Sequence, residues 1–336
     1  MRGYLSLMLF LGCFRAFAQE MPVYTQYIFN SYLLNPAVTG IDNYIDTKLG
    51  YRNQWKGLEG APVTQYFSIH APIGQDFVQS SVNSFGGNGD NPMSRSYVYT
   101  YRAAEPHHGI GLNGMIDQAG LLKQTKLNLT YAYHIGLSET MNLSLGLSAG
   151  LKYFNFDQKA MQVDDDSDFL LTSSSTNNRI SAELGAGIWL YGSRYFLGIS
   201  GMSLGGRFIP MNDAKRSGTD KMQPSFYLTT GYKFFAGEDF GIIPSMLVKY
   251  NSAIPTIIDG NLKVAFRDRV WLGGGFRSYD SFSALAGFNV SHLLNLSYSY
   301  DFTSSNLNTV SNGTHEIVLG ILLNNKYRLN CSRYIF

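Results

Sequence analysis

Long stretches of this chain alternate strictly between apolar residues and small or polar residues. The stretch 143–153 has Leu, Ala or Tyr at every odd position and Ser, Gly or Lys at every even position. The stretches 127–135 and 294–302 repeat the pattern. Alternation with a period of two residues indicates β-strands whose two faces meet different surroundings. Several of these strands would contain about ten residues or more, whereas strands of soluble sheets most often contain about five or six.

The composition indicates that these strands lie in a membrane. Aromatic residues make up 14% of the chain and charged residues only 15%, against about 25% charged residues in an average soluble domain. A soluble β-sandwich also has alternating strands, but the apolar face here repeats Leu and Tyr in more strands than one sandwich interior would hold. We therefore predict an all-β fold, a transmembrane antiparallel up-and-down β-barrel in the outer membrane of a Gram-negative bacterium.

Breaks in the alternation predict about 14 strands, an even number as expected for a single-chain bacterial barrel. With both termini taken as periplasmic, the short connections fall on the periplasmic side and the long stretches 156–178 and 204–223 on the extracellular side. The predicted strands lie near 44–53, 62–72, 108–117, 124–136, 140–155, 179–192, 194–203, 224–236, 239–251, 255–267, 269–278, 281–291, 293–302 and 313–323.

One segment does not fit this count. Residues 73–107 fall on the periplasmic side, yet they are long and include the strand-like sequence SYVYTY at 96–101. The segment is either a periplasmic excursion or an additional pair of strands, which would give a barrel of 16 strands.

The N-terminus has the features of a secretory signal. Arg2 precedes a short apolar stretch, and Ala16-Phe17-Ala18 provides the small-residue cleavage pattern. The apolar stretch is too short to span a bilayer as a helix. A lipoprotein signal ending at Cys13 is the less favoured alternative. The predicted organisation is a signal peptide at 1–18, an N-terminal motif segment at 19–43, the barrel at 44–323 and a periplasmic tail at 324–336.

Two neighbouring motifs carry a family resemblance. QYIFNSYLLNPAVTG spans Gln26 to Gly40, and YRNQWKGLEGAPVTQYFSIHAPIG spans Tyr51 to Gly74. Together they closely resemble the PorP/SprF family of the type IX secretion system of Bacteroidetes. The chain departs from the family pattern in the insert 73–107 and at Thr314, where the family more often has Ser.

The resemblance implies a function and partners. It implies a non-enzymatic outer-membrane protein that helps to export or anchor a secreted surface adhesin through the adhesin's C-terminal targeting domain. In gliding members the client is the motility adhesin, and other members contact periplasmic, peptidoglycan-associated components. No cofactor and no nucleic-acid partner are implied. The alternative is a channel that transports solutes, because a barrel of this size can be plugged or open.

Polar residues interrupt the alternation before the first strand. Asn30, Asn35 and Pro36 break any apolar face, and Pro36 lacks a backbone donor. We expect this segment to fold into the lumen as a plug or to line the periplasmic mouth, with a purely stabilising seal as the simpler alternative.

Four further residues surround the tip of the first predicted hairpin: Arg52, Gln54, Trp55 and Gly60. Arg and Trp are frequent in binding hot spots, so these residues are candidates for docking a partner outside the cell. In the simpler interpretation Trp55 belongs to an interfacial aromatic girdle.

No residue pattern predicts a catalytic or metal site. His315 and Glu316 are adjacent on a predicted strand, so their side chains point to opposite faces. The acidic stretch Asp164 to Asp168 lacks the spacing of a Ca²⁺ loop, and a solvated loop is the favoured interpretation. A net charge of +2 gives no indication of nucleic-acid binding.

Overall fold

The computed structural model describes residues 24–74, 101–156, 178–206, 208–210, 222–237, 239–267, 269–304 and 309–325. The predicted signal peptide, residues 75–100 of the insert, the acidic stretch Asp164 to Asp168 and residues 326–336 of the predicted tail lie outside this part.

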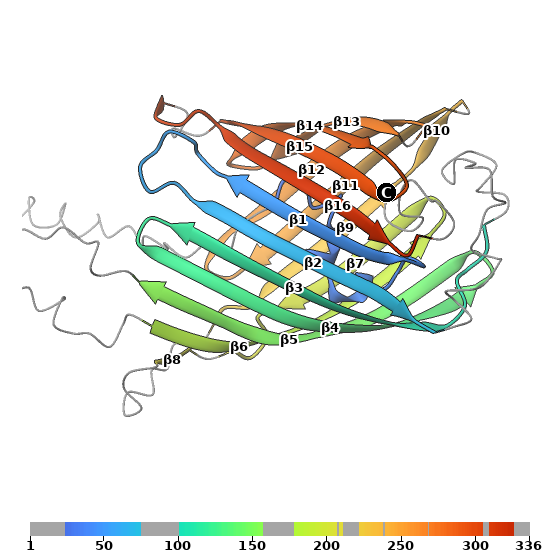
Figure 1. The fold of residues 1–336 in the computed structure, drawn as a ribbon, viewed down its shortest axis with the longest axis horizontal. Coiled ribbons are helices and arrows are strands. Elements are labelled where there is room, and N and C mark those ends of the chain that lie inside the picture. The colour runs from blue at the N-terminus through green and yellow to red at the C-terminus, as the bar shows by residue number, and fades with distance from the viewer. Residues whose placement is uncertain are drawn as a thin grey trace, which may run out of the picture.

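The described strands form one sheet that closes on itself (Figure 1). The first strand pairs with the last, and β9 pairs with β11, so the ring has no open edge. β10 continues β9 after a break at Lys233, and β8 continues β7 along β6, which leaves 14 barrel strands. The strands are β1 Ile45–Asn53, β2 Val63–Ile73, β3 His107–Ala119, β4 Leu122–Ser138, β5 Met141–Phe156, β6 Asn178–Gly192, β7 Tyr195–Met202, β8 Phe208–Pro210, β9 Ser225–Tyr232, β10 Phe234–Ala236, β11 Phe240–Asn251, β12 Ile254–Phe266, β13 Val270–Arg277, β14 Ser281–Asn289, β15 Leu294–Thr303 and β16 Thr314–Leu323.

The predicted barrel and its strand number are confirmed. β2 pairs directly with β3, with Ile73 opposite His108, so no extra pair of strands stands between them. The described end of the insert, residues 101–106, contains no strand and lies against the barrel. Tyr101 and Ala104 are buried there, and the Ala104 amide donates to Asn142 Oδ1 at 2.8 Å.

The two faces of each strand differ as the alternation predicts. On β5, Leu145 and Leu147 point away from the barrel and are 50% and 62% exposed. Ser144 is fully buried and Ser148 nearly so, because both face the interior. An apolar outer face is stable only in contact with lipid, since water would be ordered around it.

The two ends of the barrel carry different connections. We call the end with the β1–β2 hairpin the loop end and the opposite end the turn end. Short connections such as residues 139–140 and 193–194 lie at the turn end. The connections predicted to be long, 156–178 and 204–223, join strands at the loop end.

Residues 24–44, called here the lumen segment, lie inside the barrel (Figure 1). They form two short 3-10 helices, Ser31–Leu33 and Pro36–Val38, and then enter β1 at the turn end. Within the described residues, no helix is long and apolar enough to cross a membrane. The lumen segment starts near the loop end, because Thr25 contacts the last residues of β1 and β15. It therefore runs through the barrel from one end to the other.

Candidate functional site

The Asn-Pro pair of the lumen segment shapes its second helical turn. Asn35 caps this turn, and its Oδ1 accepts the amide of Ala37 at 2.9 Å. Pro36 occupies the first position of the turn, where its missing N–H leaves no partner unsatisfied. The Asn35 amide group also donates to the carbonyls of Ile188 and Ile199 at 3.0 and 3.3 Å. One side chain thus fixes the turn and attaches it to β6 and β7.

Glycines of the wall let the lumen segment come close to the strands. A Cβ placed on Gly146 would lie 2.2 Å from the amide nitrogen of Ala37. A Cβ on Gly187 would lie 2.0 Å from Asn35 Oδ1. Contacts of this kind are too short for any side chain, so glycine at these positions is required by the path of the segment.

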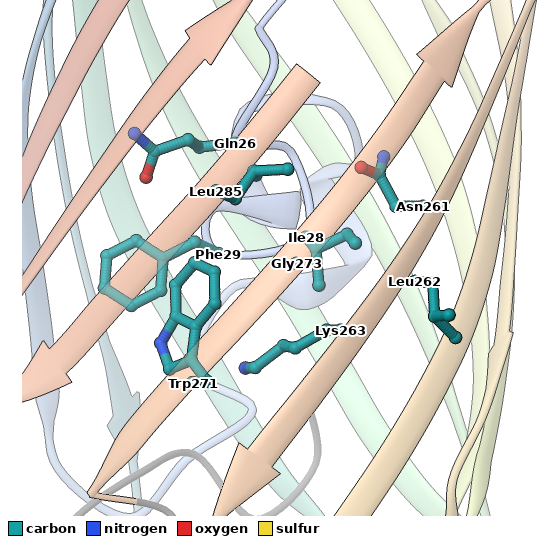
Figure 2. Close-up of a pocket in the computed structure, with 9 residues that line it drawn as sticks. All are labelled: Gln26, Ile28, Phe29, Asn261, Leu262, Lys263, Trp271, Gly273 and Leu285. Carbon is teal, nitrogen blue, oxygen red and sulfur yellow. The ribbon is translucent and has the colours of Figure 1, made fainter. Parts of the chain in front are cut away.

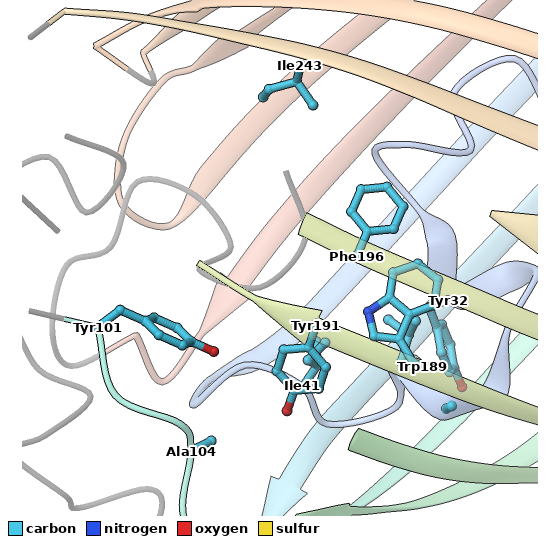
Figure 3. Close-up of a cluster of buried hydrophobic side chains, with 10 residues drawn as sticks. Tyr32, Ile41, Tyr101, Ala104, Trp189, Tyr191, Phe196 and Ile243 are labelled. Atoms are coloured by element: carbon cyan, nitrogen blue, oxygen red, sulfur yellow. The ribbon is translucent and has the colours of Figure 1, made fainter. Parts of the chain in front are cut away.

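The middle of the lumen segment packs against aromatic residues of β6 and β7 (Figure 3). The rings of Trp189 and Phe196 stack with centroids 5.0 Å apart, and Trp189 is fully buried. Tyr32 of the segment is buried as well, and its hydroxyl lies 2.7 Å from Thr130 Oγ1. The interior at this point therefore combines an apolar cluster with a hydrogen bond of the Tyr32 hydroxyl.

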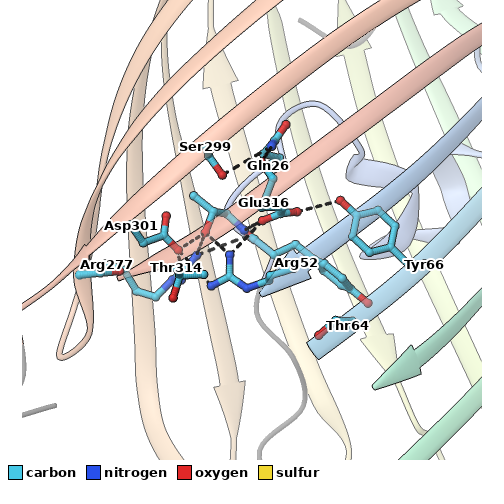
Figure 4. Close-up of polar contacts among 12 residues, drawn as sticks. Gln26, Arg52, Thr64, Tyr66, Arg277, Ser299, Asp301, Thr314 and Glu316 are labelled. Carbon is cyan, nitrogen blue, oxygen red and sulfur yellow. Dashed lines mark hydrogen bonds and ion pairs between the residues drawn. The ribbon is translucent and has the colours of Figure 1, made fainter. Parts of the chain in front are cut away.

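Arg52 is the centre of a buried polar cluster at the loop end (Figure 4). Its Nη1 donates to Glu316 Oε2 at 2.9 Å and to Thr25 Oγ1 at 2.7 Å. Its Nη2 donates to Asp301 Oδ2 at 3.0 Å. The guanidinium, only 1% exposed, thus joins β1, β15, β16 and the start of the lumen segment.

The same carboxylates bind the lumen segment directly. The Thr25 amide donates to Glu316 Oε2 at 3.0 Å, and the Thr25 hydroxyl donates to Asp301 Oδ2 at 2.7 Å. Gln26 donates to the Glu316 carbonyl at 3.0 Å, and the Tyr66 hydroxyl donates to Glu316 Oε1 at 2.7 Å. Each carboxylate therefore has donors both from the wall and from the segment.

A second arginine extends this cluster. Arg277 Nε donates to Asp259 Oδ2 at 2.9 Å, and its Nη1 lies 3.2 Å from Asp280 and 4.0 Å from Asp301. Buried charges are costly unless they are paired and hydrogen-bonded. Here Asp301 stands between Arg52 and Arg277, so the charges compensate one another across several strands.

Three histidines hold the lumen segment toward the turn end. Gly40 donates its amide to His70 Nδ1 at 3.2 Å, and its carbonyl lies 3.1 Å from His107 Nε2. The Thr39 carbonyl lies 2.8 Å from His134 Nε2. The rings of His107 and His134 stack with centroids 4.4 Å apart. Ring nitrogens thus satisfy the backbone groups of a segment that has no strand neighbour to do so.

Little space remains between the lumen segment and the opposite wall (Figure 2). Phe29 of the segment faces Trp271, with ring centroids 6.4 Å apart, and Lys263 Nζ lies 4.8 Å from the centre of the indole. The cavity between them measures about 10 Å³, close to the minimum for a single water molecule. This part of the interior has no room for a solute.

The family model for the type IX secretion system membrane protein PorP/SprF matches residues 16–321. The chain belongs to this family. With its apolar outer face and closed sheet, this PorP/SprF member is an integral outer-membrane protein. The comparison with curated protein sequences finds no match.

Solved structures resemble this family member only at low sequence identity. The toluene transporter TbuX of Ralstonia pickettii is 8% identical with a TM-score of 0.48, over 90% of this chain and 94% of that one. A toluene transporter TodX of Pseudomonas putida is 10% identical with a TM-score of 0.48, over 88% and 93%. Omp33 of Acinetobacter baumannii is 7% identical with a TM-score of 0.43, over 85% and 99%.

Four of the seven candidate residues of the family motifs lie inside the barrel, at different places. Asn30, Asn35 and Pro36 lie in the lumen segment, and Asn30 donates to Ser68 Oγ at 3.0 Å. Arg52 was expected outside, near the hairpin tip. It points inward instead, because it lies four residues after Lys48 on the inward face of β1.

The other three candidates stay in the β1–β2 hairpin. Gln54 and Trp55 are partly exposed and Gly60 is exposed. The Trp55 amide donates to Thr314 Oγ1 at 3.1 Å, and the Gly60 carbonyl accepts the Gly120 amide at 2.8 Å. The hairpin is thus fixed to neighbouring connections at the loop end, away from the lumen segment.

The sequence did not indicate the partners of Arg52. The alternation predicted only that the side chains of His315 and Glu316 point to opposite faces of their strand. This is confirmed: Glu316 is fully buried, and His315 contacts Tyr298 on the outer face. Among the residues that the structure describes, no group of three His, Cys, Asp or Glu side chains is arranged to hold a metal ion.

Proposed function

We propose that this chain is a non-enzymatic accessory protein of type IX secretion, which anchors or helps export a secreted surface adhesin through the adhesin's C-terminal targeting domain. The observation that carries the proposal is the position of the family motif. The segment Gln26 to Gly40 lies within the barrel and is bonded near both ends. A barrel that holds a segment of its own chain in the lumen is suited to bind a partner at its rim rather than to pass solutes.

The loop end is the surface we assign to the cargo. The β1–β2 hairpin presents Gln54, Trp55 and Gly60 there, and its backbone is held by Thr314 and Gly120. A preordered surface loses little conformational entropy when a partner binds. Trp55 is partly exposed there, and Trp is frequent in binding hot spots. The periplasmic contacts expected from the family resemblance would use the turn end.

Affinity purification from detergent-solubilised outer membrane of the native host tests the proposal. We expect a secreted protein with a C-terminal targeting domain to co-purify with the wild type, and its recovery to fall at least about tenfold with Trp55→Ala, as for a hot-spot residue. Val290→Ala is the control, because Val290 is 52% exposed in the connection between β14 and β15 at the turn end, away from the proposed cargo surface.

The channel alternative predicts a different result. The purified barrel would then conduct strongly in planar bilayers, and no secreted protein with such a domain would co-purify. That combination would refute the accessory function.

A further inference from the structure

Two aromatic residues at the loop end have a left-handed backbone conformation. Trp55, in the β1–β2 hairpin, has a φ of 50°, and Tyr279, in the β13–β14 hairpin, has a φ of 65°. This conformation is unfavourable for a bulky residue, because its Cβ comes too close to the following carbonyl oxygen. Turns that need it normally have glycine or asparagine at that position. Each of the two aromatic residues therefore makes its turn less stable than glycine would.

The side chain of Tyr279 gives no local reason for this strained backbone. Arg267, in a turn at the opposite end, has a similar φ of 49°. Its guanidinium, however, pairs with Asp239 at 2.8 Å and lies 5.4 Å from the centre of the Phe266 ring. The Tyr279 side chain is 83% exposed and, within the described residues, makes no hydrogen bond and no ring contact. Strained residues of this kind occur where a chain binds a partner.

The hairpins that carry the two rings are joined through the connection between β15 and β16. On one side, the Ser304 amide donates to the Asp280 carbonyl at 2.8 Å. On the other side, the Asn312 amide donates to the Lys56 carbonyl at 2.7 Å, and the Lys56 amide donates to the Gly313 carbonyl at 2.9 Å. Three successive hairpins thus form one surface, called here the rim platform, with the described residues 54–62, 278–280, 304 and 309–313.

The backbone of the rim platform is also held by the polar residues next to the lumen. Arg277 Nη1 donates to Asp280 Oδ2 at 3.2 Å, beside Tyr279. The Trp55 amide donates to Thr314 Oγ1 at 3.1 Å. Both rings therefore extend from a backbone that is ordered before a partner arrives, which reduces the entropy lost on binding.

The two rings are close enough for one protein domain to contact both. Four strand intervals separate the two hairpins in the ring, which corresponds to about 20–25 Å along the rim of a barrel with tilted strands. An interface of standard size covers about 800 Å² on each partner and is about 30 Å across. Val310, 55% exposed in the connection between the hairpins, adds a further apolar side chain to the platform.

We propose that Tyr279 is a second anchor of the cargo surface, and that one folded face of the adhesin's C-terminal targeting domain packs on Trp55 and Tyr279 together. This inference rests on the proposed function and extends its surface to a second hairpin. The partner face presents apolar pockets for the two rings, since aromatic anchors contribute most when a partner encloses them and excludes water. Val310 contacts the same face between the two pockets.

Affinity purification of Tyr279→Gly from detergent-solubilised outer membrane of the native host tests this inference. Recovery of the secreted protein should fall at least about tenfold, as for a hot-spot residue. The barrel itself should be as stable as the wild type or more stable, because glycine removes the backbone strain; the midpoint of heat-modifiable gel migration measures this. Tyr279→Phe keeps the ring and should keep the recovery. A variant that is equally stable but binds less cannot owe its loss of binding to misfolding.

Arg267→Gly is the matched control, because it makes the same backbone change at the opposite end of the barrel; it should keep the recovery of the wild type. Equal recovery with the wild type and Tyr279→Gly would refute this inference alone. A less stable Tyr279→Gly barrel with unchanged recovery would also refute it, because Tyr279 would then anchor the barrel in the membrane interface. If no secreted protein co-purified even with the wild type, the proposed function and this inference would fail together.

Discussion

Some single residues of this barrel form hydrogen bonds both to the wall strands and to the lumen segment. Arg52 is part of β1, yet two of its nitrogens bind carboxylates of β15 and β16, and one also binds Thr25 of the lumen segment. Asn35 likewise caps a turn and reaches the carbonyls of two strands. Replacement of such a residue removes several hydrogen bonds and leaves their partners buried without compensation.

Arg52→Met tests how much the buried ion pairs contribute to the stability of the barrel. The variant leaves Asp301 and Glu316 without their shared cation, and we expect a loss of about 3–5 kcal/mol in the free energy of unfolding. Denaturant titration of the folded barrel in detergent, followed by heat-modifiable gel migration, measures this loss. Arg267→Met is the control, since its pair with Asp239 is largely exposed and an exposed ion pair contributes little to stability. Similar losses for both variants would contradict the role given to Arg52.

At the scale of elements, the strands could be predicted from the sequence, whereas the lumen segment could be predicted only in part. Period-two alternation is local, so each strand and its outward face follow from its own residues, as Leu145 and Ser144 illustrate. The polar break at Asn35 and Pro36 showed that residues before β1 could not be a lipid-facing strand. The pairing of Arg52 with Glu316 was not predictable, because it depends on barrel closure between residues 264 positions apart. The interruption of β9 at Lys233 was also missed, since it falls where β7 begins and Lys233 bonds to Arg194 of the preceding turn.

Gly146→Val tests whether the lumen segment closes the barrel. The new side chain would occupy the position of the Ala37 backbone, which has no flexible end that could move aside. We expect the segment to shift from β5 and the single-channel conductance in planar bilayers to rise above that of the wild type. Gly274→Val, on the outer face, should leave the conductance unchanged. A Gly146→Val barrel that remains folded and conducts no better than the wild type would contradict the closure.

At the scale of the molecule, the two ends of the barrel differ in the length of their connections: apart from residues 74–106 between β2 and β3, each connection at the turn end is short. Long connections and the β1–β2 hairpin share the loop end, while compact turns such as residues 193–194 share the turn end. Bacterial barrels carry short turns on the periplasmic side and longer loops outside. We therefore expect the loop end to face the exterior.

Cysteine labelling of intact cells measures this orientation. In a background with Cys331→Ser, Lys56→Cys should react with a membrane-impermeant maleimide, because Lys56 is exposed at the loop end. Arg269→Cys, exposed at the turn end, should react only after the outer membrane is opened. The reverse pattern would invert the orientation and would move the proposed cargo surface to the periplasm.

The position of Arg52 has a consequence for the order in which the barrel is made. Its bonds to Asp301 and Glu316 cross the junction where the first strand meets the last two. They cannot form until all the intervening strands have been inserted, and Thr25 must be in place to complete them. We therefore expect closure of the ring to be coupled to the entry of the N-terminal residues during biogenesis. A nascent barrel would then stay open along this seam until Thr25 has entered the lumen.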